Sequence, residues 1–232
     1  MEYWSFIEYK SSNMLLKQAY KCDKEMHTHG NFSWFTFVAQ IKHITLGSHC
    51  TESPLSGHEV TLVKARLQRR HASTWKKKLL DDNKCKSVNG KKLRTYRQFK
   101  LNYGLEEYLY QISNPLVRKE LTKFRTSTHK LMIEVGRHCN INLENRLCKM
   151  CHHKVIEDEK HFLLQCPYYH KNRIVLMNKI KVISPLITNL NIADQLIWIM
   201  SCKEPAIITA VANYVAQSMK LRIEGMASVK TA

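Results

Sequence analysis

The chain has 232 residues, of which 44% are hydrophobic, so it can bury a core and is not expected to be wholly disordered. Its 37 Lys and Arg against 19 Asp and Glu give a formal net charge of +18, which favours nucleic acid as a partner. An anionic membrane surface and a generic role in solubility are the competing explanations. Scarce glycine (7) and proline (5) disfavour a turn-rich β-sandwich and predict a mainly α fold, an irregular helical bundle.

Residues 1–57 are predicted to be a poorly defined N-terminal segment, because their aromatic residues follow no clear period. Glu2 and Glu8 occupy positions where a secretory signal needs a basic segment and an apolar core. The most apolar runs, 32–41 and 206–216, fall short of the roughly 20 residues that span a bilayer. We therefore expect an intracellular protein, nuclear or cytoplasmic, that is not secreted and has no membrane partner.

Residues 58–140 are predicted to form a basic helical region. Val63, Leu67, Trp75 and Leu79 recur at multiples of four, which indicates an amphipathic helix with a basic outer face. A second helix is expected to carry Leu93, Tyr96, Phe99 and Tyr103 on one side.

The positive charge is concentrated in this region, since residues 61–100 hold fourteen Lys and Arg and only two acids. Such side chains would contact the phosphate backbone of RNA or DNA with little sequence preference. The interleaved Trp75, Tyr96 and Phe99 share the helical period of the leucines, which favours a core role over base stacking. The predicted nucleic-acid ligands are Arg66, Arg69, Arg70, Lys76, Lys77, Lys78, Lys91, Lys92, Arg94 and Arg97.

A further helix is predicted to begin at Pro115. Asn114 can cap it, and proline suits the first helical position, where its missing N–H has no partner to lose. Leu116, Leu121 and Phe124 are expected to face inward.

Residues 141–182 are predicted to form a metal-binding module with the pattern C-x2-C-x9-H-x4-C, which is Cys148, Cys151, His161 and Cys166. Two cysteines separated by two residues direct both thiolates at one ion, and the later pair can complete a tetrahedron. Four protein ligands leave no open position, so we expect one structural Zn²⁺ rather than a catalytic ion. A redox pair and chance clustering are the alternatives, and His170 competes with Cys166 as the fourth ligand.

Residues 183–232 are predicted to form C-terminal helices over 192–200 and 205–222. The second has Ile208, Val211, Val215 and Met219 on one face.

Several runs resemble the C-terminal region of animal LINE-type retrotransposon proteins, which follows their endonuclease and reverse transcriptase domains. They are KFRTSTHKLMIEVGR (123–137), RLCKMC (146–151) and IEDEKHFLLQCPY (156–168), with LRTYRQFK (93–100) and EEYL (106–109) matching the preceding helical stretch. The resemblance covers roughly residues 60–180. It places the family's CCHC knuckle on Cys148, Cys151, His161 and Cys166 and implies contact with the element's RNA or its target DNA.

The catalytic domains of that family are absent from this chain, so we expect no enzyme activity and no small-molecule substrate. Leu79-Leu80-Asp81-Asp82 superficially matches the aspartate pair of a polymerase, but lysines flank it where an apolar hairpin is needed. The predicted function is non-catalytic binding of RNA or DNA by a fragment of a retrotransposon reverse transcriptase. The alternative is a host adaptor that uses the zinc module to hold a protein partner.

Overall fold

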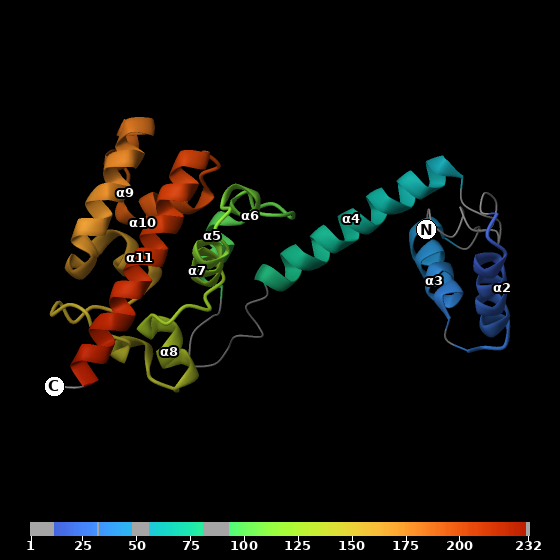
Figure 1. Ribbon diagram of the computed structural model, residues 1–232, viewed down its shortest axis with the longest axis horizontal. Helices are drawn as coiled ribbons and strands as arrows, with labels where there is room; N and C mark the ends of the chain where they lie inside the picture. The colour runs from blue at the N-terminus through green and yellow to red at the C-terminus, as the bar shows by residue number, and fades with distance from the viewer. Residues whose placement is uncertain (1–11, 32, 48–55, 81–92, 231–232) are drawn as a thin grey trace. The chain divides into compact units, whose positions relative to one another are not determined.

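In this computed structural model the described residues are 12–31, 33–47, 56–80 and 93–230. They form helices joined by turns and contain no β-strand, so the predicted mainly α fold is confirmed (Figure 1). Their one trace of β-structure is an isolated antiparallel bridge between Leu147 and Ile156. No helix in the described part of the chain is long and apolar enough to cross a membrane.

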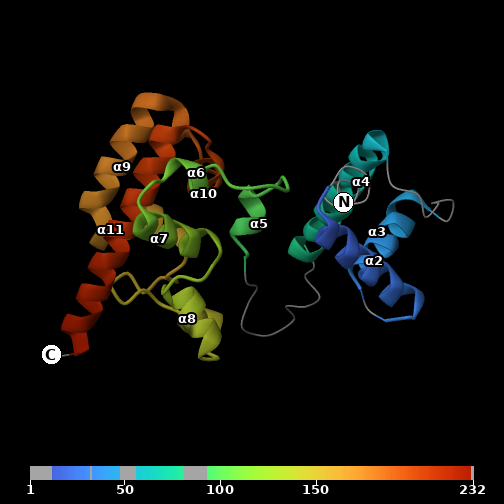
Figure 2. The ribbon, with the colours of Figure 1, turned by 45° about the vertical axis from the view of Figure 1, so that its right-hand side comes forward.

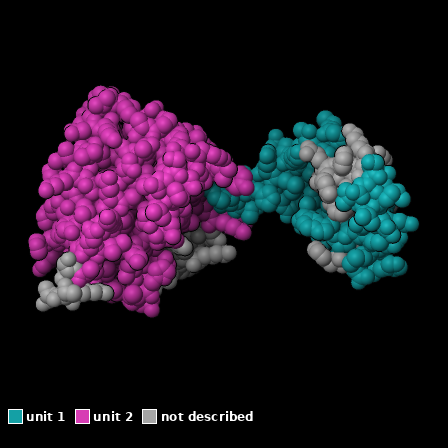
Figure 3. Space-filling model, in the orientation of Figure 1, with its two compact units in different colours: residues 1–76 teal, residues 77–232 magenta. Residues whose placement is uncertain are grey.

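The chain divides into two compact units between Lys76 and Lys77, inside helix α4 (Figure 3). The first unit contains α2 (Met14–Thr28), α3 (Trp34–Leu46) and most of α4 (Gly57–Leu80). The Ser33 hydroxyl accepts a hydrogen bond from the Thr36 N–H and caps α3. A small apolar cluster forms around the buried Val60 and Val63 of α4, with partly buried side chains of Ile41, Leu46 and Leu67 packed on it.

The second unit contains seven α-helices among its described residues. They are α5 (Tyr96–Phe99), α6 (Tyr108–Gln111), α7 (Pro115–Arg125), α8 (Met132–His138), α9 (His170–Ile183), α10 (Ile192–Ser201) and α11 (Pro205–Lys230). Helix α11 packs against both α7 and α9, as the two ribbon views show (Figure 2). The core beneath it holds the aromatic rings of Phe124, Phe162, Tyr169 and Tyr214, which contact one another in tilted and edge-on arrangements.

The predicted inner face of α11 is confirmed. Ile208, Val211, Val215 and Met219 are all buried, and they lie on one side because three to four residues make one helical turn. The helix continues past Arg222 to Lys230. In the core, the Tyr214 hydroxyl donates a hydrogen bond to the Phe162 carbonyl over 2.6 Å, which ties α11 to the segment that carries the metal-binding motif.

Helix α7 begins as predicted. The Asn114 side chain accepts hydrogen bonds from the N–H groups of Leu116 and Val117, at 2.9 and 3.3 Å. Leu121 and Phe124 are buried, but the inward position predicted for Leu116 is wrong, since its side chain is 71% exposed. Leu116 lies five and eight residues before the two buried ones, which turns it roughly 80–140° away around the helix.

The second basic helix is much shorter than the sequence predicts. Helix α5 makes a single turn, because Leu93 just before it has a φ of 60° and Lys100 just after it turns the chain away. The Lys100 ammonium donates to the Gly104 carbonyl over 2.8 Å and closes a loop in which Tyr103 is 53% exposed.

Candidate metal centre

The first two candidate ligands lie in a tight hairpin, residues 146–157, here called the metal hairpin. Its arms are joined by hydrogen bonds from the Cys148 N–H to the Val155 carbonyl (2.8 Å) and from the Glu157 N–H to the Arg146 carbonyl (2.9 Å). The hairpin keeps Cys148 and Cys151 side by side, and the Met150 N–H approaches the Cys148 sulfur at 3.4 Å. A backbone donor at this position stabilises a thiolate.

The second two candidate ligands are brought together by a wide turn, the π-helix His161–Gln165. The Asp158 carboxylate accepts a hydrogen bond from the His161 N–H (2.7 Å), and the Cys166 N–H donates to the His161 carbonyl (2.7 Å). A π-turn joins residues five apart, which is the spacing of His161 and Cys166. An ordinary α-turn joins residues four apart, so it would not bring the side chains of His161 and Cys166 together in this way.

These four side chains meet at one point. Cys148, Cys151, His161 and Cys166, here called the metal-ligand group, are all buried, and their donor atoms lie within 4.8 Å of one another. The two sulfurs of Cys148 and Cys166 are 3.9 Å apart, and the Cys151 sulfur is 3.5 Å from the His161 Nε2. A tetrahedron with zinc–sulfur bonds of about 2.3 Å and zinc–nitrogen bonds of about 2.0–2.1 Å has S–S and S–N edges of about 3.8 and 3.5 Å. The group can hold a metal ion.

The other nearby candidates do not join this group. His170 is exposed at the start of α9, and His152, His153 and Cys139 are exposed as well. The fourth position is therefore occupied by Cys166, which is buried.

Without a metal, two of the three thiols resist ionisation. The hydrogen bond from Cys148 to Cys166, together with burial, raises the pKa of Cys148 to about 12. Burial also raises the pKa of Cys151, whereas the hydrogen bond from Cys148 lowers the pKa of Cys166. A metal ion must therefore displace protons from Cys148 and Cys151, which makes its affinity depend on pH.

A buried ion pair ties the metal hairpin to α11. The Arg222 guanidinium donates to both carboxylate oxygens of Glu157, at 2.8 and 2.7 Å, and the Glu157 side chain is fully buried. The same carboxylate accepts the Met132 N–H (2.7 Å) and lies 3.9 Å from the Cys148 sulfur. One acidic side chain thus connects α8, α11 and the metal-ligand group.

A second buried carboxylate, Glu159, pairs with a histidine and an arginine. Its oxygens contact the His129 ring nitrogen (2.9 Å) and the Arg94 guanidinium, which also binds Glu134 at 2.6 Å. Burial raises the pKa of Glu159, but the hydrogen bond and charge of His129 and the charge of Arg94 outweigh it and lower the pKa to about 2. Glu159 therefore stays ionised in the folded protein.

The importance of Glu157, Glu159 and Arg222 was not inferred from the sequence. The available signal was three consecutive acids, 157–159, which stand in a basic chain and end two residues before the candidate ligand His161. Acids that close to a thiolate cluster need cationic partners when buried, and those partners come from distant segments.

The predicted nucleic-acid ligands fall into distinct groups. Arg69, Arg70, Lys76, Lys77 and Lys78 are exposed on α4, as is Arg66, whose guanidinium donates to the Thr45 carbonyl. Arg94 forms ion pairs with the buried carboxylates of Glu134 and Glu159. The half-buried Arg97 donates a hydrogen bond to the Leu93 carbonyl over 3.4 Å. Lys91 and Lys92 lie outside the described residues, as do Asp81 and Asp82.

Comparison with known proteins identifies no relative. No family model, no curated protein and no solved structure matches the chain. What the metal-ligand group and the basic helix do is therefore inferred from their own atoms.

Proposed function

We propose that this chain binds nucleic acid without catalysing a reaction, and that a structural zinc ion organises its second unit. The tetrahedral separation of the donor atoms in the metal-ligand group supports zinc. Three sulfurs and one imidazole nitrogen form a soft donor set that suits Zn²⁺, whereas Mg²⁺ and Ca²⁺ prefer oxygen.

The proposed zinc ion has a structural role. Four protein ligands leave no position for water, so the ion neither activates a nucleophile nor polarises a substrate. Its effect is to fix the metal hairpin and the π-turn relative to each other, and through Glu157 and Arg222 to fix both against α11. On the scale of small zinc modules, binding contributes on the order of 10 kcal/mol to the folding of this segment.

Metal analysis tests this role. We expect one zinc per chain in the purified protein, little in Cys166→Ala, and an unchanged content in His170→Ala, the matched control beside it. Cobalt substitution should give the visible absorption of a tetrahedral thiolate site. Zinc-free protein whose circular dichroism and thermal unfolding match those of zinc-loaded protein would exclude a structural ion.

The nucleic-acid proposal is carried by the arrangement of exposed cations on α4. Arg69 and Arg70 precede Lys76 and Lys77 by seven residues, so the two pairs lie on one face about 10.5 Å apart along the helix axis. This helix contains seven Lys and Arg but a single acid, Glu59. The lysines near the C-terminus also complement the helix dipole, which is a purely structural use of the same charges.

This surface suits a phosphate backbone. Arginine forks and lysine point charges bind phosphate oxygens, and the face offers no repeated Asn, Gln or Arg pattern that reads base edges. The sequence resemblance points the same way, because it implies contact of the LINE-type C-terminal region with RNA or target DNA. We therefore propose a nucleic-acid-binding region of the kind found C-terminal to a retrotransposon reverse transcriptase.

Charge reversal of Arg69, Arg70, Lys76 and Lys77 to glutamate tests the nucleic-acid proposal. Four phosphate contacts give a log–log salt slope of about −3 to −4, and the variant should lose affinity for RNA or DNA and most of that slope. The matched control reverses four exposed lysines elsewhere, Lys171, Lys179, Lys181 and Lys220.

Equal loss in both variants would show a general charge effect and refute an α4 surface. Unchanged binding in the α4 variant, with an intact protein complex, would favour the alternative of a zinc-dependent adaptor.

A further inference from the structure

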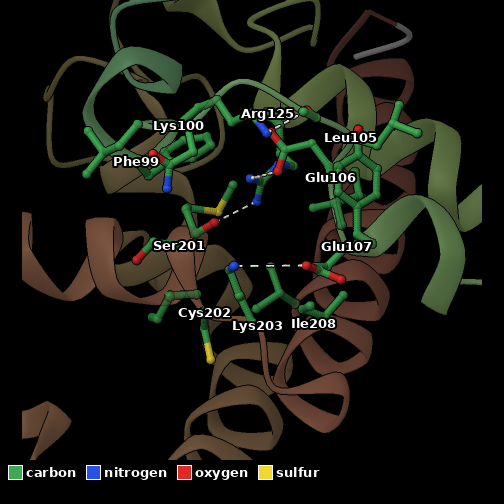
Figure 4. Close-up of a pocket in the computed structure, with 18 of the residues that line it drawn as sticks. Phe99, Lys100, Leu105, Glu106, Glu107, Arg125, Ser201, Cys202, Lys203 and Ile208 are labelled. Atoms are coloured by element: carbon green, nitrogen blue, oxygen red, sulfur yellow. Dashed lines mark hydrogen bonds and ion pairs between the residues drawn. The ribbon is translucent and has the colours of Figure 1, made fainter. Parts of the chain in front are cut away.

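A cavity of about 340 Å³ opens in the second unit, bounded by the loop 100–107, the end of α10 and the start of α11 (Figure 4). It is distinct from the metal-ligand group, none of whose residues line it. Its volume is at the lower end of the range for small-molecule sites, roughly 300–1,000 Å³. Here it is called the loop cavity.

The loop cavity combines an apolar interior with a few charged groups. Leu121, Ile199, Ile208 and Val211 supply the apolar surface, and Tyr103, a residue that is 53% exposed, lies in the loop. This combination is typical of a binding site, because apolar walls supply affinity and placed charges supply orientation.

The charges on the inner wall do not cancel. Lys100 and Arg125 both pair with Glu106, at 3.4 and 2.9 Å, and the three side chains are only 12, 10 and 17% exposed. Two cations therefore share one carboxylate, which leaves one positive charge. Among the described residues that line the cavity the other carboxylate is Glu107, which lies 4.0 Å from Lys203 at the exposed rim (Figure 4).

Arg125 is held rigidly in this wall. Its guanidinium donates to the Met200 carbonyl over 2.7 Å and lies over the ring of Phe99, 4.4 Å from the centroid. Burial lowers the pKa of Arg125, and the opposing effect of Glu106 does not restore it. An anion in the cavity would complete the neutralisation of this buried cation pair.

We propose that the loop cavity binds one unpaired nucleotide of a single-stranded nucleic acid, with the phosphodiester at Lys100 and Arg125 and the base against the apolar wall. A phosphodiester carries one negative charge, which equals the residual charge of the wall, whereas a phosphate monoester carries about 1.5–2. Flat bases are the part of such a chain that an apolar cavity takes up. The site adds to the proposed function a preference for unpaired strands.

Calorimetric titration of the full, zinc-loaded chain tests the site. The probes are the dinucleoside monophosphate ApA, with one phosphodiester, then adenosine, which has no phosphate, and AMP, a free monoester. ApA should bind at least about tenfold more tightly than adenosine. Lys100→Gln should remove that advantage and leave adenosine binding unchanged, and Lys171→Gln, an exposed lysine on α9, is the matched control.

Ser201→Phe provides a second variant, because this exposed residue at the end of α10 lines the cavity and a phenyl ring would fill it. It should abolish binding of both ApA and adenosine while the melting temperature stays close to wild type. ApA binding that survives both Lys100→Gln and Ser201→Phe would overturn the proposal, as would the absence of ApA binding. Tighter binding of AMP than of ApA would make a free nucleotide the occupant and overturn the assignment to a strand.

The outcome is separable from the role of α4. Reversal of the α4 charges should weaken long oligonucleotides and leave ApA binding unchanged, because ApA is too short to need that surface. Loss of ApA binding in the Lys100 variant with full oligonucleotide binding would confine the site to short ligands and refute its role in the strand. If ApA binds as expected but reversal of the α4 charges leaves oligonucleotide binding unchanged, the α4 surface is refuted instead.

Discussion

Replacement of Arg222 by methionine should destabilise the second unit strongly. The substitution keeps the length and apolar stem of the side chain but removes both hydrogen bonds to Glu157, at 2.8 and 2.7 Å. Glu157 is fully buried, and without Arg222 its carboxylate loses its cationic partner while it still accepts the hydrogen bond from the Met132 N–H. Removing one partner of such a pair costs about 3–5 kcal/mol, a large part of the total stability of a typical domain.

Urea unfolding followed by circular dichroism, with zinc in excess, measures this loss. The matched control is Lys220→Met, an exposed cation two residues earlier on α11, for which we expect a change within about 0.5 kcal/mol. Adding Glu157→Gln to the Arg222 variant should restore part of the stability, since it removes the unpaired charge. A loss below about 1 kcal/mol in Arg222→Met, or a double variant less stable than the single one, would refute the reasoning.

The same variant should also weaken zinc binding. Glu157 lies 3.9 Å from the Cys148 sulfur and already raises the pKa of that thiol. With Arg222 absent, the full negative charge of Glu157 faces a thiolate that must form when zinc binds. Competition with a chromophoric chelator should show a lower zinc affinity in Arg222→Met and a restored affinity in the double variant with Glu157→Gln. Equal zinc affinity in wild type and both variants would contradict a link between the ion pair and the metal.

Three further substitutions test the packing. Gly136→Ala places a methyl group 2.5 Å from the Cγ of the buried Arg146 and should lower the free energy of unfolding by about 1–3 kcal/mol in thermal unfolding. Gly57→Ala, which has open space around it, is the control and should be nearly neutral. Asn114→Ala removes the cap of α7 and should cost about 1 kcal/mol in urea unfolding, with Ser113→Ala as a silent neighbour. Phe162→Ala empties the centre of the aromatic core and should cost about 3–5 kcal/mol, and a loss no larger than that of Asn114→Ala would contradict the central position of this ring.

The members of the metal-ligand group were predictable because their geometry is local. All four lie within residues 148–166, and the hairpin and the π-turn that assemble them depend on spacings visible in the sequence. The cap at Asn114 and the inner face of α11 were predictable for the same reason, since each follows from neighbours within a few turns.

What the sequence could not supply are the pairings between distant segments. Arg94 carries the same charge as its neighbours and was predicted to bind nucleic acid, yet it is held by Glu134 and Glu159, which lie 40 and 65 positions further on. Charge pattern identifies a cation but says nothing of a partner that arrives from elsewhere in the fold. The predicted length of α5 was wrong for a similar reason. The loop that ends this helix depends on a side-chain contact from Lys100 to Gly104, which helical periodicity does not reveal.

The distance along the chain between the metal hairpin and its partner on α11 has a consequence for the order of folding. The hairpin and π-turn close over short loops, so they can form and take up an ion before α11 has been synthesised. Glu157 then remains hydrated until Arg222, 65 positions later, arrives and both are withdrawn from water together. Docking of α11, rather than metal uptake, is therefore the step at which the second unit becomes cooperative, and slowed synthesis between residues 166 and 222 should accumulate a metal-loaded intermediate that proteases still cleave.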